Sequence, residues 1–110
     1  MVDRRTQALF EARAAVIKAM AHATRLIIID ELARHDRCVQ ELTDIIGADA
    51  STVSRHLSIL RAVGIVESEK KGLQVFYSLR VPCVMDFFKC VESVIKSNVV
   101  QQVQLLKSKD

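Results

Sequence analysis

The sequence predicts a mainly α-helical chain with one β-hairpin, an α+β class, and three observations lead to this expectation. Apolar residues recur at helical intervals along most of the chain, whereas strict alternation is confined to residues 65–79. Gly64 and Pro82 stand at the two borders of that alternating stretch. The 110 residues, of which 50% are hydrophobic, suffice for a single domain over 1–110 with a small core.

Two helices are predicted before the middle of the chain. Residues 6–20 place Leu9, Ile17 and Met20 at helical intervals, which indicates a first helix. His22 to Arg25 interrupt that pattern, and Thr24 is a suitable N-cap for a second helix. We expect its dense aliphatic cluster at the centre of the core: Leu26, Ile27, Ile28, Ile29 and Leu32. Residues 35–37 form a polar turn.

The next two segments have the outline of a helix-turn-helix. Residues 39–46 are amphipathic, and Gly47-Ala48 connect them to a helix over residues 51–64, with Asp49 as N-cap and Gly64 as its stop. On this helix the apolar stripe that faces a core is formed by Val53, Leu57 and Leu60. Two consecutive helices in any small bundle show the same spacing, so the pattern alone leaves that alternative open.

The other face of this helix carries short hydroxyls and a guanidinium. Such side chains approach nucleic acid closely and donate hydrogen bonds to phosphates and base edges. The predicted DNA contacts are Ser51, Thr52, Ser54, Arg55, His56 and Ser58. The net charge of +3 permits such a partner without requiring it.

A β-hairpin is predicted after Gly64. Residues 65–70 and 73–79 are its strands and Lys71-Gly72 its turn, and one face of the second strand collects Leu73, Val75, Tyr77 and Leu79. A hairpin after a recognition helix is a wing, which can lie along the DNA backbone or in the minor groove. Its predicted contacts are Lys70, Lys71 and Gln74, with Arg80 near the base. A solvated charged turn is an equally open interpretation of Lys71.

The last segment predicts a long helix from Pro82 to about Leu106. Pro82 suits the first helical position, and an a/d-like seam is formed by Val84, Phe88, Val91 and Ile95. So long an apolar helix exceeds what a small core needs. We therefore expect it to form a homodimer interface together with the first helix, which gives a helix-turn-helix protein the two-fold symmetry for two half-sites.

This order of elements resembles the winged helix-turn-helix repressors of the ArsR/SmtB type. The blocks that carry the resemblance are residues 21–26, 38–42, 51–57 with Leu60, 64–66 and 72–79, so it covers nearly the whole chain. It implies a dimeric transcriptional repressor that binds double-stranded operator DNA until a metal, a metalloid or another signal releases it. The chain shows no apolar run or leader of the signal type, so we expect a cytoplasmic protein with no membrane partner.

An enzyme is not expected from this sequence. It contains no Gly-rich phosphate loop, no carboxylates paired for a pocket and no nucleophile with an evident base. An interaction module that does not bind DNA is the alternative from a different class.

The three cysteines determine the predicted inducer. Arsenic-responsive members resemble this chain at the start of the third helix, where their pattern is Cys-Val-Cys-x-Leu-Cys. Here only Cys38 matches, because Gln40 and Thr43 stand at the other two positions. Cys83 and Cys90 supply further thiols, and three thiols suit trivalent arsenic or antimony, with cadmium or lead as alternatives. We predict these three cysteines as the metal ligands, and no constitutive cofactor.

Geometry restricts that site. Seven helical residues rise about 10.5 Å, whereas two thiolates on one ion lie no more than about 5 Å apart. Cys83 and Cys90 therefore share an ion only if the chain at Pro82 is unwound; otherwise Cys38 joins one of them, within a subunit or across the dimer. Structural cysteines and a thiol redox or persulfide sensor remain open alternatives.

The family's zinc site of carboxylates and histidines on the closing helix finds no match here. That helix contains Asp86 and Glu92 but no histidine. His22, His35 and His56 are scattered over other elements, where a structural role or a contact to the DNA backbone is favoured over metal binding. The sequence therefore disfavours zinc or nickel as the inducer.

Overall fold

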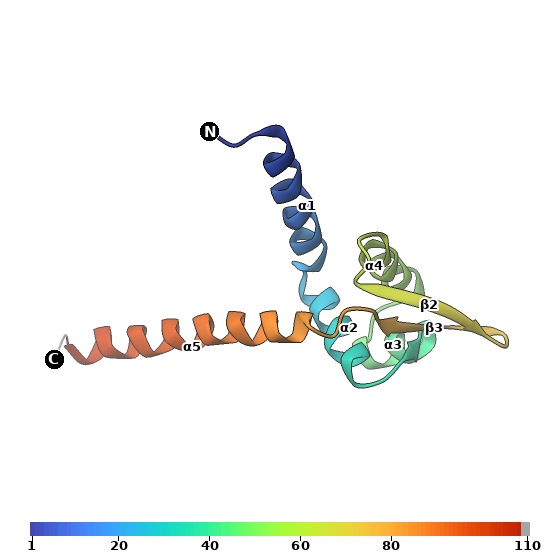
Figure 1. Cartoon of the computed structure of the whole chain (residues 1–110). Coiled ribbons are helices and arrows are strands. Elements are labelled where there is room, and N and C mark those ends of the chain that lie inside the picture. Colours follow the sequence, from blue (N-terminus) through green and yellow to red (C-terminus); the bar gives the residue numbers. More distant parts are fainter. Residues whose placement is uncertain (109–110) are drawn as a thin grey trace.

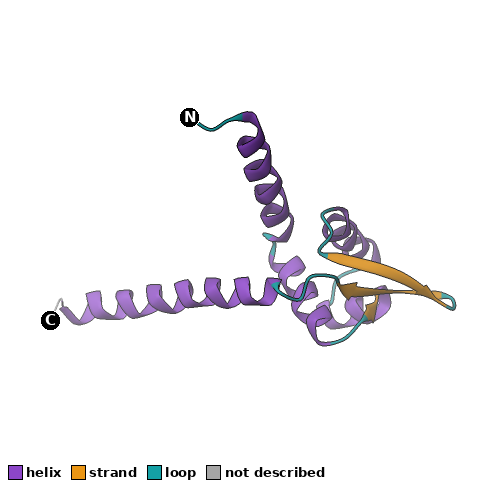
Figure 2. Ribbon diagram, in the orientation of Figure 1, coloured by secondary structure: helices purple, strands orange, loops and turns teal. Residues whose placement is uncertain are grey.

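The fold was derived from a computed structural model, which describes residues 1–108 (Figures 1 and 2). The described part contains five helices and a small antiparallel sheet. In chain order the elements are α1 (Arg4–Met20), α2 (Ala23–Arg34), β1 (Arg37–Cys38), α3 (Val39–Ile46), α4 (Ala50–Ala62), β2 (Val66–Lys71), β3 (Gln74–Leu79) and α5 (Val84–Ser108). The predicted mainly α class with a β-hairpin wing is confirmed, and the fold is a winged helix-turn-helix.

The core lies between α2, α3, α4 and the start of the hairpin. Its largest fully buried side chains are Ile28, Ile29, Leu42, Val53, Leu57, Leu60 and Val66. The aliphatic cluster of α2 enters this core only in part, since Leu26 and Ile27 are 41% and 48% exposed. The expectation that the whole cluster is central was wrong, because a helix of consecutive apolar residues presents them to all sides.

The sheet has three strands in the order β1-β3-β2, and both pairings are antiparallel. Strand β1 was not predicted: its two residues, Arg37 and Cys38, pair with Tyr77 and Phe76 of β3. Lys71 pairs with Gln74, so the hairpin turn is Gly72-Leu73 and not Lys71-Gly72. Gly72 takes the positive φ of 66° that the turn requires, and Leu73 is fully exposed instead of sharing a face with Val75.

Two helix starts differ from the sequence prediction. The N-cap of α2 is His22, whose Nδ1 accepts a hydrogen bond from the backbone N–H of Thr24 at 3.1 Å, so Thr24 is not the cap. Helix α5 begins at Val84, and Pro82 and Cys83 lie in the preceding turn. In that turn the N–H of Asp86 donates to the carbonyl of Cys83 at 3.1 Å, the short spacing of a 3₁₀-type turn.

Helices α1 and α5 project from this core in different directions (Figure 1). The radius of gyration is 18.0 Å, whereas a compact chain of this length has about 13 Å. Among the described residues, the part of α5 that joins the core is its first turns, through Val84, Met85 and Phe88. Val91, Ile95 and Val99 remain 43%, 57% and 54% exposed. None of the described helices combines the length and the apolar character needed to cross a membrane.

Candidate nucleic-acid interface

Helix α4 is fixed at its N-terminus by Asp49, as predicted. The carboxylate accepts hydrogen bonds from the backbone N–H of Thr52 at 2.8 Å and from the hydroxyl of Ser51 at 2.9 Å. The hydrogen bonds from Thr52, followed by the one from Ser51, lower the pKa of Asp49, so this cap is ionised at neutral pH. The first turn of α4 is therefore held in a defined position.

One side of α4 is buried in the core and the other is exposed to solvent. Val53, Leu57 and Leu60 are fully buried. The predicted contact residues Ser51, Arg55 and Ser58 recur at i, i+4 and i+7 on the opposite side, where all three are exposed. Thr52 and Ser54 are half-buried at the edges of this stripe. The helix thus offers a polar ridge on a backbone that its buried face holds rigidly, the arrangement that major-groove recognition uses.

His56, also predicted as a DNA contact, is not part of this ridge, and its burial does not support that prediction. The side chain is 7% exposed, and its Nδ1 accepts a hydrogen bond from Nε of Arg25 at 3.0 Å. The helical position of residue 56 could have predicted this burial. It lies three positions after Val53 and next to Leu57, on the helical face that packs inward. The inward role of Arg25 was missed because its partner lies 31 residues away.

The wing lies beside α4 and points away from α5 (Figure 1). Its predicted contact residues Lys70, Lys71 and Gln74 are all exposed near the tip. The ammonium of Lys71 lies 5.6 Å from the ring centroid of Phe76, a cation–π contact that restricts this side chain. At the base, a guanidinium nitrogen of Arg80 donates to the carbonyl oxygen of Gly64 at 3.3 Å and joins the hairpin to the end of α4.

The three cysteines do not form a cluster within one chain. Cys38 is 5% exposed at the start of α3, whereas Cys83 and Cys90 are exposed before and on α5. Among residues 1–108 no group of three histidine, cysteine, aspartate or glutamate side chains is close enough to share a metal ion. A three-thiol site therefore does not fit a single subunit.

Cys38 is held by a charged network. Glu41 accepts a hydrogen bond from the backbone N–H of Cys38 at 3.1 Å, one half of a capping box at the start of α3. That bond, with a smaller effect of Arg37, lowers the pKa of Glu41. Arg37 binds Glu41 and Glu31, each at 3.0 Å. This network links α2 to the first helix of the helix-turn-helix.

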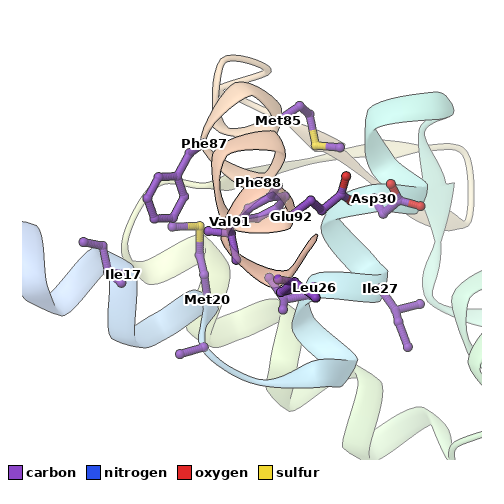
Figure 3. A pocket seen from close by; sticks show the side chains of 12 residues that line it. Ile17, Met20, Leu26, Ile27, Asp30, Met85, Phe87, Phe88, Val91 and Glu92 are labelled. Carbon is purple, nitrogen blue, oxygen red and sulfur yellow. The ribbon is translucent and has the colours of Figure 1, made fainter. Parts of the chain in front are cut away.

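An apolar groove is lined by side chains such as Ile17, Met85 and Val91 (Figure 3). It measures about 650 Å³ and is formed by α1, α2 and α5. Its walls include Met20, Leu26 and Phe88, and Asp30 and Glu92 add carboxylates at one end. In a single chain this groove leaves much apolar surface in contact with water.

Comparisons with known proteins agree with this architecture. Residues 22–68 match the profile described as bacterial regulatory protein, arsR family. The transcriptional regulator YgaV of Escherichia coli is 34% identical over 89 residues, which cover 80% of this chain and 90% of that protein. The chain belongs to the arsR family. This is a family of transcriptional regulators and not of enzymes.

Two further relatives extend the comparison. The transcriptional repressor SmtB of Mycobacterium tuberculosis is 37% identical over 71 residues, which are 64% of this chain and only 53% of that protein. The solution structure of Mb0332 from Mycobacterium bovis, a homodimeric winged helix-turn-helix DNA-binding domain described as a possible ArsR-family regulator, superposes with a TM-score of 0.77 at 31% identity. That superposition covers 89% of this chain and 91% of the other.

Proposed function

We propose that this arsR-family chain is a transcriptional repressor that binds double-stranded operator DNA as a homodimer. The observation that carries the proposal is the polar ridge of Ser51, Arg55 and Ser58, presented by a helix whose opposite face is fully buried. A guanidinium on such a ridge can read the O6 and N7 atoms of a guanine. The basic wing tip lies beside the ridge and supplies contacts to phosphates.

The homodimer is supported by the outer surface of the chain. Helices α1 and α5 expose apolar side chains such as Phe10, Val94 and Val100, each more than half exposed. A second copy would cover this surface and the adjoining groove, because two-fold pairing places the same apolar patch on both partners. Two recognition helices would then face one palindromic site.

Selection from random-sequence duplexes tests this function. The purified protein should enrich one two-fold symmetric sequence whose half-sites lie about one helical turn apart, roughly 10 base pairs. Arg55→Glu should abolish the enrichment, whereas Lys107→Glu, which makes the same charge change at the far end of α5, should preserve it. A pool from which the wild-type protein enriches no sequence would contradict the proposal.

We further propose that a thiophilic ion, trivalent arsenic or antimony, is the inducer and that Cys38, Cys83 and Cys90 hold it. The thiol chemistry supports this choice, since thiolates are soft ligands. Because the three cysteines of one chain do not meet, the site would combine thiols of two subunits. Ion affinity should fall as the pH is lowered, because the cysteine thiols must lose their protons to bind the ion.

Release of the selected operator should be titrated with arsenite, antimonite, cadmium, lead and zinc in parallel. Arsenite or antimonite should act at the lowest concentration. Cys38→Ser should keep operator binding and lose the response, and at least one of Cys83→Ser and Cys90→Ser should do the same. Unchanged release in the triple serine variant would refute the ion site, and cross-linked or persulfide-modified cysteines in mass spectra after mild oxidant or sulfide would indicate a redox sensor instead.

A further inference from the structure

A polar cluster joins the end of α1, the start of α2 and the recognition helix α4. The guanidinium of Arg25 makes two hydrogen bonds in this cluster. Its Nε donates to Nδ1 of His56 at 3.0 Å, and its Nη1 donates to the carbonyl oxygen of Ala19 at 3.0 Å. His22 adds a ring contact, because the centroids of the His22 and His56 rings lie 4.6 Å apart. Nδ1 of His22 also caps α2 by accepting from Thr24.

These hydrogen bonds require both imidazoles to be neutral. In each ring Nδ1 is the acceptor, so it carries no proton and the proton is on Nε2. Protonation would turn the acceptor of His56 into a donor that faces the Nε–H of Arg25. Protonation of His22 would remove the acceptor that caps α2. Either event breaks a hydrogen bond and adds a positive charge to the cluster.

The surroundings of His56 offer nothing to balance that charge. Within the described residues, the groups that act on its titration are His22 and Arg25 from the start of α2 and Arg55 from α4 itself, none of them an acid. Lys18 of α1 lines the adjoining cavity together with His22 and Arg25. Burial, followed by these neighbours, lowers the pKa of His56 below its ordinary value of 6.5.

The cluster lies directly behind the recognition helix α4, so it can affect how that helix is positioned on DNA. His56 follows Arg55 directly in the chain and lies on the inward face of α4, opposite the polar ridge. Arg25 connects this inward face to the last turn of α1, one of the two helices of the proposed dimer interface. In the proposed dimer this contact would therefore influence the relative orientation of the two recognition helices.

We propose that Arg25, His22 and His56 are positioning residues that hold α4 against the junction of α1 and α2, and that proton uptake by the two imidazoles loosens this hold and weakens specific operator binding. This inference rests on the proposed function as a dimeric DNA-binding repressor. It adds a regulatory input, proton concentration, that acts without the cysteines.

The sign of the effect follows from the proton balance. The position of α4 that we propose for operator binding needs neutral rings, whereas a chain in which this cluster has opened can take up protons, so lower pH favours release. Below the pKa of His56 in the free protein, specific affinity should fall by up to about tenfold per pH unit for each proton that a protomer takes up. Binding to unrelated DNA should rise or stay constant, because added positive charge attracts phosphates.

The test measures fluorescence anisotropy with the selected operator and with a scrambled duplex, at constant ionic strength, from about pH 8 to about pH 5. Asparagine places an amide oxygen near the position of Nδ1, caps helices well and does not titrate. His22→Asn/His56→Asn should therefore keep the affinity of the wild type at pH 8 and lose its decline at low pH. His35→Asn, which changes the exposed third histidine, should decline like the wild type.

Nuclear magnetic resonance titration of the histidine rings gives a second measurement on the unaltered protein. The pKa of His56 should be lower in the operator complex than in free protein, by the amount that the affinity change requires. A flat affinity profile in the wild type, an equal decline in the double asparagine variant, or equal pKa values in both states would overturn the inference. A wild-type protein that fails to bind the selected operator at pH 8 would instead contradict the proposed function.

Discussion

The winged unit, residues 23–79, and the two outer helices α1 and α5 use apolar residues in opposite ways. In the winged unit, residues such as Ile29, Leu42 and Leu57 are fully buried within the same chain. On the outer helices, Phe10, Ile95 and Leu106 are 54%, 57% and 71% exposed. The winged unit is therefore complete in one chain, whereas the outer helices carry an apolar surface that the same chain leaves exposed and that the proposed second subunit would cover.

This contrast separates two roles. The DNA-reading surface needs a rigid support, which the core behind α4 supplies from within the subunit. In the proposed dimer the spacing between two such surfaces would be set by α1 and α5, and α5 projects away from α4 (Figure 1). A change in the winged unit should therefore alter the DNA contacts of each subunit. A change in α5 should instead alter the pairing of subunits.

The largest effect is expected from a charge on α5. Val91→Glu places a carboxylate in the apolar seam, where burial without a partner is costly, so we expect monomers that keep their helical circular dichroism. Loss of the second half-site should reduce operator affinity by about 10²- to 10⁴-fold. Sedimentation velocity and anisotropy measure both effects. Ile45→Glu, at an equally exposed position on α3, should remain dimeric, and a dimeric Val91→Glu protein would refute the placement of the interface.

A pair of alanine substitutions sharpens the comparison. Leu57→Ala opens a cavity in the winged unit and should lower the free energy of unfolding by about 2–5 kcal/mol at every protein concentration. Val99→Ala on α5 removes surface from the proposed partner contact, so its effect on the thermal midpoint should be largest at high protein concentration and should shrink as dilution dissociates the dimer. Calorimetry over a dilution series distinguishes them; identical concentration dependence in the two variants would mean that α5 is not an interface.

Arg55→Ala should affect DNA reading without affecting assembly. If the guanidinium contacts a base edge, specific binding weakens by about 1–3 kcal/mol and the preference at one position of each half-site relaxes. Anisotropy with a set of single-substituted operators measures both. Equal losses on all sequences would assign Arg55 to the phosphate backbone.

The smallest effect is expected from Lys71→Ala at the wing tip. As a phosphate contact, Lys71 should contribute similarly to all sequences, and its loss should reduce the slope of log affinity against log salt by about one unit. Removal of the cation also ends its contact with Phe76. An unchanged salt slope would show that the wing tip is a solvated turn and not a DNA contact.

Local sequence patterns were enough to predict most of the fold. The amphipathic segment at residues 39–46, the Asp49 cap and the exposed ridge of Ser51, Arg55 and Ser58 all follow from neighbours within two helical turns. Errors arose where a choice depended on strand register. The turn at Gly72-Leu73 is one residue from its predicted position, because the pairing of Lys71 with Gln74 is settled by the sheet as a whole.

By itself, then, the sequence determined the order of the five helices and the hairpin, the apolar stripe of α4 that enters the core and the exposed ridge of Ser51, Arg55 and Ser58. Those features depend on periodicity and caps, which act over a few residues. Only the tertiary structure decided that His56 turns inward to Arg25, that Cys38 stands apart from Cys83 and Cys90, and that α1 and α5 project with their apolar faces uncovered. These features depend on contacts between residues distant in the chain, and the geometry of such contacts is set by packing and not by spacing.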